Sequence, residues 1–211
     1  MEQRSPDWYA ARLGKATASR IADNVAKTKT GYSTSRANYL AELLCERLTG
    51  VTAESYVSPA MQWGTDKEQE ALSLYEFRAD ETLEPVGFVD HPTIAMSGAS
   101  PDGLVGDRGL VEVKAPLTAT HLDTLLGRSV PGRYQTQIQW QLACTGRAWC
   151  DFVSFDPRLP GNMRLFVRRL HRDDLGIAEL ENGARHFLAE LEAKLEEINE
   201  AVARSTWPAH S

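Results

Sequence analysis

The sequence predicts an α/β fold built on a mixed sheet, and two observations lead to that class. Segments with apolar residues at spacings of three and four stand near both ends of the chain, which is the pattern of amphipathic helices. Segments with alternating apolar residues fill the middle and are separated by turn residues, which is the pattern of strands. The predicted order is helices, a meander of three strands, a helix, two more strands and a closing helix.

The helices are predicted from this spacing and from their start and stop residues. Ser35 is expected to cap a helix that stops at Gly50, and Pro59 opens another, because its missing N–H is harmless at the first helical position. Residues 27–34 are basic and are expected to form a loop. The apolar stripe of the last helix is expected to pack against the core or an interface. The predicted helices cover residues 7–24, 35–49, 59–77, 131–145 and 173–204.

The strands are predicted from segments of period two that end at turn signals such as Asp90-His91-Pro92 and Asp156-Pro157. Asp102 is expected to lie in a turn at the end of the second strand, so that a hairpin-like pairing brings it toward the third. The predicted strands cover residues 84–89, 94–97, 109–114, 149–155 and 163–170.

A single domain is expected over residues 1–211, because no repeat, low-complexity tract or Pro/Gly-rich linker divides the chain. Its expected parts are N-terminal helices with a basic loop (1–58), a core (59–170) and an amphipathic helix (173–204). The three cysteines form no C-x-x-C pair, so neither a disulfide framework nor a structural zinc site is expected. Neither a signal-peptide pattern nor an apolar run of membrane-spanning length occurs, so we expect a cytoplasmic protein with no membrane partner.

The net charge of −6 argues at first against a nucleic-acid partner. The distribution of charge reverses this inference, because the first 36 residues carry seven basic and only three acidic side chains, mixed with Trp8, Tyr9 and Tyr32. A local positive patch is therefore available despite the negative total, a solvated surface of scattered charges is the alternative interpretation, and the stretch alone does not decide between them.

One group of residues indicates chemistry. In a strand over 109–114, Glu112 and Lys114 share one face while Val111 and Val113 point into the core. A second carboxylate, Asp102, converges on Glu112 through the hairpin. Two carboxylates make a hard oxygen site suited to Mg²⁺ or Mn²⁺, and the adjacent lysine is placed to orient or deprotonate a water. This arrangement suits hydrolysis of a phosphodiester. Taken separately, the two halves also fit a surface ion pair and an ordinary turn.

The spacing P-D-(x9)-E-x-K resembles the signature of PD-(D/E)XK nucleases, and the order of elements agrees with that fold. Over about residues 5–200 the chain also resembles the family of phage lambda exonuclease and the YqaJ-type viral recombinases. Six ordered blocks carry the resemblance: 8–19, 63–77, 98–104, 109–116, 133–142 and 155–158.

The resemblance implies roles for the residues of the active site. Asp102, Glu112 and the backbone carbonyl of Val113 match the metal ligands, and Lys114 matches the catalytic lysine. Glu68 falls where the family has an acidic residue near a second metal, and Gln137 matches an active-site glutamine. The alternative is that Glu68 belongs to a wet acidic helix and that Gln137 is merely solvated.

The resemblance also implies a site for the 5′-phosphate of the digested strand, formed by Arg12, Ser19 and Ser100. Arginine offers a bidentate fork to phosphate, and serine hydroxyls reach its remaining oxygens. An ion pair of Arg12 with a neighbouring acid is the alternative. Met61 matches an apolar wedge that parts the terminal base pair, and Lys29 is the nearest equivalent of a basic side chain that enters the groove.

The function implied is a 5′-to-3′ exonuclease that uses two Mg²⁺ ions, with Mn²⁺ as a substitute, and degrades one strand of linear duplex DNA from 5′-phosphorylated ends to mononucleotides. The resemblance further implies a homotrimer ring, a single-strand annealing partner for recombination through the exposed 3′ strand, and a phage or prophage gene expressed in the bacterial cytoplasm. The alternatives are an endonuclease or single-strand-preferring nuclease of the same fold and, from a different class, a non-catalytic DNA-end-binding module.

Overall fold

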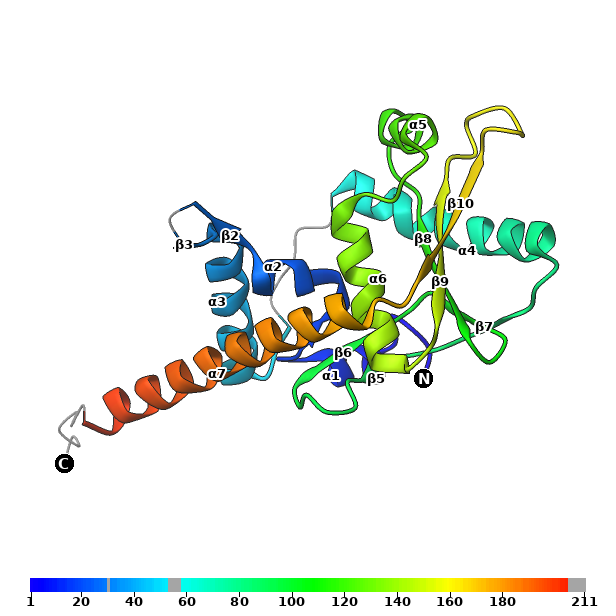
Figure 1. The fold of residues 1–211 in the computed structure, drawn as a ribbon. Coiled ribbons are helices and arrows are strands. Elements are labelled where there is room, and N and C mark those ends of the chain that lie inside the picture. Colours follow the sequence, from blue (N-terminus) through cyan, green and yellow to red (C-terminus); the bar gives the residue numbers. More distant parts are fainter. Residues whose placement is uncertain (30, 53–57, 205–211) are drawn as a thin grey trace.

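The structure is a computed structural model that describes residues 1–29, 31–52 and 58–204. Its centre is a mixed sheet of β4 (Leu83–Glu84), β7 (Gly103–Val105), β8 (Gly109–Lys114), β9 (Trp149–Phe155) and β10 (Leu165–His171), shown in Figure 1. The spatial order is β10-β9-β8-β7-β4. β8 and β9 are parallel, and the other neighbours are antiparallel. Parallel strands need a crossover, and α5 (Thr118–Gly127) and α6 (Gly132–Thr145) supply it.

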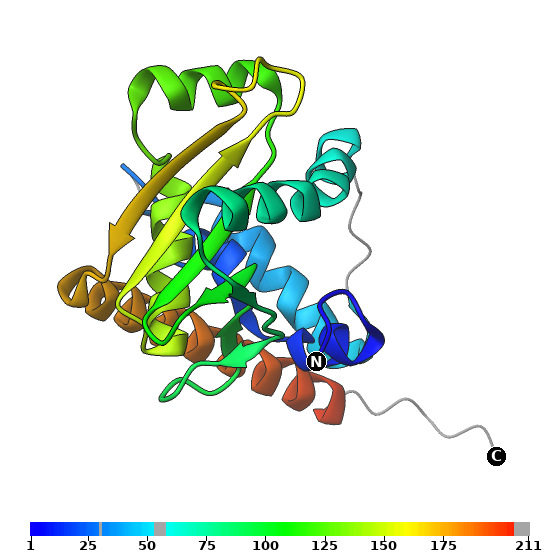
Figure 2. The same cartoon turned by 90° about the vertical axis from the view of Figure 1, so that its right-hand side faces the viewer.

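Helices cover both faces of this sheet (Figures 1 and 2). On one face, Tyr75 of α4 (Pro59–Ala79) packs with Val111 and Val113 of β8. On the other face, Ile138 of α6 packs with Leu110 of β8. β8 is therefore covered on both faces, and the side chains that point to either face of this strand are buried.

A further core joins the N-terminal elements to α3 (Thr34–Thr49) and α7 (Asp174–Arg204). Tyr39 of α3 stacks on Phe187 of α7, with ring centroids 5.6 Å apart. The predicted apolar stripe of the last helix is thus confirmed as core packing up to Leu191, and the later turns of α7 extend away from the rest of the molecule (Figure 1). Within residues 1–29, 31–52 and 58–204, none of the helices combines the length and the apolar character that a bilayer span requires.

The continuous helix predicted over 7–24 is wrong. The chain forms α1 (Pro6–Arg12), β1 (Ala16–Thr17), a 3-10 turn (Ala18–Arg20) and α2 (Ile21–Val25). Gly14 adopts φ +67°, a left-handed conformation that ends the helical path. β1 then pairs with β6 (Ser97–Ala99) in a small sheet that also contains β5 (Val89–Asp90). The tertiary pairing overrides the helical spacing of the apolar residues.

The basic segment 27–34 is a short hairpin of β2 (Lys27–Thr28) and β3 (Gly31–Tyr32) rather than a loop, with residue 30 outside the described part. Ser33, not Ser35, caps α3, because its hydroxyl accepts the N–H of Arg36. The stop at Gly50 is confirmed by its left-handed φ of +70°.

The three-strand meander is also wrong. The segment 84–89 contributes to two sheets, because β4 pairs with β7 while β5 pairs with β6. β7 has only three residues and was not predicted. The strands over 109–114 and 149–155 are confirmed with the same bounds, as β8 and β9.

α5 was also not predicted, and its burial explains why. The side chains that it buries are His121 and Thr124, while Leu122 and Leu126 are exposed. An inward face made of polar groups leaves no apolar stripe in the sequence.

Candidate active site

Asp102 lies in the bend between β6 and β7, as predicted, and the hairpin of β7 and β8 holds it beside β8. Its N–H donates to the carbonyl of Val111 (3.2 Å), which extends the ladder in which Gly103 pairs with Val111. Its Oδ2 accepts the N–H of Val113 at 2.6 Å. The carboxylate is thereby held beside the last residues of β8.

Glu112 lies in the middle of β8 with only 1% of its surface exposed. Its side chain points toward α6, whereas its sequence neighbours pack under α4. The Nε2 of Gln137 donates to Oε1 and the Nε2 of Gln141 donates to Oε2, both at 2.6 Å, and Lys114 also donates to Oε1. A buried carboxylate needs such donors, and here they fix its orientation.

The charges of this cluster influence one another. Burial disfavours the charged form of Lys114, but the carboxylates of Glu112 and Asp102 outweigh it and raise the pKa of the ammonium group. The pKa of Asp102 is also raised, first by burial and then by the negative charge of Glu112, with a smaller contribution from Glu68. The site therefore concentrates negative charge around a single ammonium group.

Glu68 reaches the same place from α4. Its carboxylate accepts from Arg4 at 2.5 Å and is 23% exposed, so the alternative of a fully wet acid does not describe it. A pocket of about 580 Å³ opens beside these groups. We call it the active-site pocket; it is lined by Ala60, Met61, Gly64, Thr65, Glu68, Val113, Lys114, Ala115, Pro116, Leu117, Thr120, Arg133 and Tyr134.

The donor set fits a hard divalent cation. Asp102 and Glu112 offer carboxylate oxygens, which Mg²⁺ and Mn²⁺ prefer. Oε1 of Glu112 already accepts two hydrogen bonds, whereas Oε2 accepts one and retains acceptor capacity. In the part of the chain that the structure describes, no group of three or more His, Cys, Asp and Glu side chains is arranged to hold a metal. The predicted site needs only two side chains and a backbone carbonyl.

A second pocket of about 290 Å³ lies among the N-terminal elements, and we call it the N-terminal pocket. Its lining includes Arg12, Ser19 and Met61, three of the residues that the sequence assigned to DNA. It also includes Tyr9, Lys15, Thr17, Arg20, Tyr39, Glu42, Leu43, Glu46 and Thr52. Met61 lines the active-site pocket as well, so the two pockets adjoin at this side chain.

Arg12 is held by contacts other than an ion pair. Its Nη1 donates to Oγ of Ser100 (3.3 Å), and its guanidinium lies 4.2 Å from the ring centroid of Trp8. The indole N–H of Trp8 donates to the same hydroxyl at 2.9 Å. Burial lowers the pKa of Arg12, and within the described residues no carboxylate forms a salt bridge with it. This positioned and partly dehydrated cation is suited to an anion.

The remaining predicted DNA contacts differ in placement. Ser19 is exposed and its hydroxyl lies 3.3 Å from that of Thr17. Met61 is 55% exposed at the border of the two pockets. Lys29 is exposed in the hairpin of β2 and β3 and lines neither pocket. The structure brings Arg12, Ser100, Ser19 and Met61 together and leaves Lys29 apart.

Several other N-terminal cations pair with acids and do not form a free basic patch. Arg4, Lys15, Arg20 and Arg36 each form a salt bridge, the last with Glu190 of α7. Arg36 is only 4% exposed, so it packs in the interior and is not accessible to a ligand. The regional charge excess overstated the number of cations available to a ligand.

No role was predicted for Gln141 from the sequence. This residue is fully buried and donates to Glu112. Gln137 and Gln141 are four residues apart, so they share one helix face, and that spacing was the available signal.

Comparisons with known proteins agree with this geometry. Residues 7–148 match the family described as the YqaJ-like viral recombinase domain. A comparison with curated proteins gave no match.

Among solved structures, the alkaline exonuclease LHK-Exo from Laribacter hongkongensis is 50% identical and has a TM-score of 0.90, over 96% of this chain and 100% of that one. A structure of LHK-Exo in complex with dAMP matches with the same values. A phage-related exonuclease from Haemophilus somnus 129PT is 15% identical with a TM-score of 0.72, over 87% of this chain and 96% of that one, and shows the fold alone. The predicted PD-(D/E)XK fold, a mixed sheet flanked by helices, is confirmed.

Proposed function

Since the chain belongs to the family of YqaJ-like viral recombinase domains, we propose that it is an exonuclease that degrades one strand of linear duplex DNA from 5′-phosphorylated ends. We further propose the 5′-to-3′ direction, release of mononucleotides and a 3′ single strand left for recombination by annealing. The relative at 50% identity is an alkaline exonuclease, which supports the nuclease activity. One observation carries the proposal: Met61 joins the active-site pocket, which Glu68 and Lys114 line, to a pocket that contains Arg12.

The proposed roles follow from the geometry. Asp102, Glu112 and the carbonyl of Val113 would hold Mg²⁺ or Mn²⁺, and Glu68 would serve a second ion. When bound, these cations would polarise the phosphodiester and lower the pKa of the attacking water. Gln137 and Gln141 orient the Glu112 carboxylate through their amide donors. Lys114, which donates to Glu112, would orient or deprotonate the attacking water, or stabilise negative charge on the phosphate.

The N-terminal pocket would select the end of the strand. Arg12 would form paired hydrogen bonds with the terminal phosphate, and the hydroxyls of Ser100 and Ser19 would contact its other oxygens. Met61, at the border, would part the terminal base pair. Because one strand would occupy both pockets, the phosphate contact sets which bond reaches the carboxylates. Lys29 would contact the duplex outside both pockets.

The decisive assay compares linear 5′-phosphorylated, linear 5′-hydroxyl and closed circular duplex DNA, each with Mg²⁺ and with chelator. We expect digestion of the linear phosphorylated duplex with Mg²⁺, slower digestion of the hydroxyl end, and survival of the circle. Cleavage of the circle would instead support the endonuclease alternative. Binding to ends without any hydrolysis would support the non-catalytic module.

Three further features are proposed on the family resemblance: a homotrimer ring, a single-strand annealing protein as partner, and action in the bacterial cytoplasm from a phage or prophage gene. A closed ring would keep the enzyme on its substrate without ATP. Light scattering of the purified chain tests the trimer, and a monomer over the working concentration range would rule out the ring.

A further inference from the structure

An arginine next to the active-site pocket contacts both the turn after β8 and helix α4, which form two sides of this pocket. Arg158 follows β9 and is clamped by Asp156: its Nε donates to Oδ1 at 2.7 Å and its Nη2 to Oδ2 at 2.9 Å. The same Nη2 donates to the carbonyl of Pro116 (3.4 Å), and the guanidinium lies 4.5 Å from the ring centroid of Trp63. Pro116 lines the pocket after β8, and Trp63 belongs to α4.

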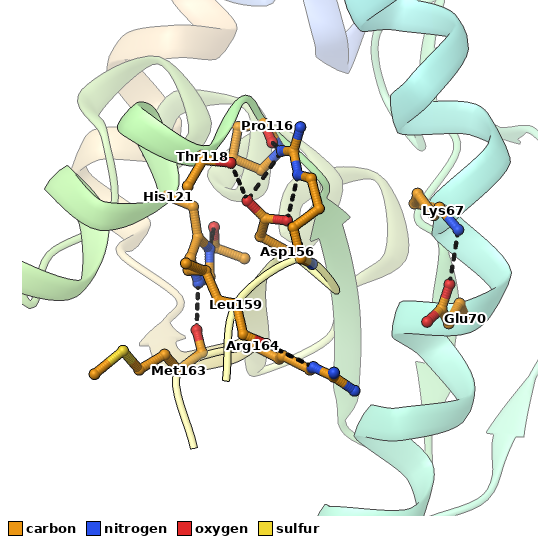
Figure 3. Close-up of polar contacts among 11 residues, drawn as sticks. Lys67, Glu70, Pro116, Thr118, His121, Asp156, Leu159, Met163 and Arg164 are labelled. Atoms are coloured by element: carbon orange, nitrogen blue, oxygen red, sulfur yellow. Dashed lines mark hydrogen bonds and ion pairs between the residues drawn. The ribbon is translucent and has the colours of Figure 1, made fainter. Parts of the chain in front are cut away.

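Asp156 is a firm anchor for this contact. Its carboxylate is fully buried, and Thr118 at the start of α5 donates to its Oδ2 at 2.6 Å (Figure 3). Although burial opposes ionisation, the hydrogen bonds from Arg158 and Thr118 lower its pKa to about 2. His121 of α5 adds contacts to Ser154 (2.7 Å) and to the Met163 carbonyl (2.8 Å). α5 and the end of β9 thus form one rigid unit.

The first half of α4 depends on such contacts. The buried residues of this helix, Ala71, Leu72 and Tyr75, all lie in its second half. The first half carries Met61 and Glu68 into the active-site pocket, yet none of its side chains is classed as buried. Among the described residues, its side-chain ties to the rest of the fold include the pair of Glu68 with Arg4 and the stacking of Trp63 on Arg158.

We propose that Arg158 is a positioning residue for the nuclease reaction, which holds the first half of α4 against the Pro116 turn and so sets the distance of Glu68 from Asp102 and Glu112. The inference rests on the proposed function. Arg158 does not line the pocket and acts through Trp63. The guanidinium suits this role because it stacks on an aromatic ring while its fork binds a carboxylate.

The chain offers a matched control at the other end of β9. Arg169 donates to both oxygens of Asp151 at 2.8 Å, and its guanidinium lies 3.4 Å from the Trp149 ring centroid. Tyr75 supplies the extra hydroxyl donor to Asp151 (2.7 Å), as Thr118 does to Asp156. The chemistry is the same, but this cluster does not touch the active-site pocket.

The experiment compares Arg158→Gln, Arg158→Lys and Arg169→Gln with the native chain. In Arg158→Gln we expect a kcat about 10- to 100-fold lower, the range found for groups that orient catalytic ligands, with a KM for DNA changed less than about threefold. Arg158→Lys retains the charge and should recover part of the loss. Arg169→Gln should lower Tm by about as much as Arg158→Gln does, but it should leave kcat within about threefold of the native value.

Hydrogen exchange provides a readout that does not need activity. Exchange of the amides of residues 60–68 should speed up about tenfold in Arg158→Gln and stay unchanged in Arg169→Gln, while residues 71–79 are unaffected in Arg158→Gln. Equal kcat losses in the two variants, or unaltered exchange over 60–68, would overturn the inference. If the native chain hydrolyses no DNA, the proposed function fails, and the exchange result still decides whether Arg158 positions α4.

Discussion

The two pockets that meet at Met61 are built in opposite ways. The active-site pocket lies beside the carboxylates of Glu112 in β8 and of Asp102 before β7, and a ladder of backbone hydrogen bonds holds these two residues in place. The N-terminal pocket takes Arg12 from the last residue of α1, and its walls come from the short elements that follow and from α3. Arg12 is placed there by side-chain contacts with Trp8 and Ser100.

Because the two pockets are held in place differently, amino-acid substitutions in them should have different effects on the reaction. The position of a residue in paired strands is set by many backbone hydrogen bonds. A substitution there should therefore change the catalytic chemistry without moving the rest of the site. A position held by one stacking contact and one hydrogen bond can shift when either is lost. We therefore expect substitutions in the active-site pocket to abolish turnover, and substitutions in the N-terminal pocket to alter selectivity.

The largest effect is expected at Asp102. Asp102→Ala should lower hydrolysis at least about 1,000-fold, because a metal ion supplies several kcal/mol of transition-state stabilisation and its ligand is removed. Affinity for 5′-phosphorylated ends in chelator should stay within about threefold, since the N-terminal pocket is intact. Rate measurements with Mg²⁺ and end-binding titrations with chelator check both halves, and retained metal-dependent hydrolysis would refute the site assignment.

The N-terminal pocket should respond in the opposite manner. Arg12→Ala should reduce the preference for 5′-phosphate over 5′-hydroxyl ends by about 10- to 100-fold, because a charge-assisted hydrogen bond is worth roughly 1.5–3 kcal/mol. Digestion of the hydroxyl end should hardly change. Competition between the two ends in one reaction measures the ratio, and Arg20→Ala serves as a control in the same pocket, because that side chain is already paired with Glu42. An unchanged ratio in Arg12→Ala would remove the phosphate role.

Gln141 tests how firmly the Glu112 carboxylate must be held. Gln141→Met removes the donor to Oε2 with little change in volume and should lower kcat about tenfold, the low end for groups that orient a ligand, because Gln137 still holds Oε1. It should also raise the Mg²⁺ concentration needed for half-maximal rate. Gln139→Met on the same helix is the control, since Gln139 contacts His171 and Asp173 instead. Equal rates in the two variants would contradict the orienting role.

The same contrast explains what the sequence predicts well. β8 and β9 were predicted with their observed bounds, because strands buried on both faces are rich in apolar residues and leave a clear pattern. The pairing of Asp102 with Glu112 followed from their spacing. Part of the N-terminal pocket comes from a segment that was predicted as one helix. The local sequence contains no signal that Ala16 and Thr17 pair with a strand some 80 residues later. The contact of Gln141 with Glu112 likewise depends on the packing of α6 on the sheet.

The smallest effect is expected at the border between the pockets. Met61 is 55% exposed, so Met61→Ala should change the free energy of unfolding by less than about 0.5 kcal/mol. If this side chain parts the terminal base pair, its loss should slow digestion of fully paired ends about 3- to 10-fold, because unstacking a base step costs a few kcal/mol and an apolar wedge offsets part of that cost. Ends whose 5′ nucleotide is already unpaired should be digested at the native rate. Digestion of the two kinds of end side by side separates a wedge from a mere wall, since a wall would affect both substrates equally and the two pockets would then act independently.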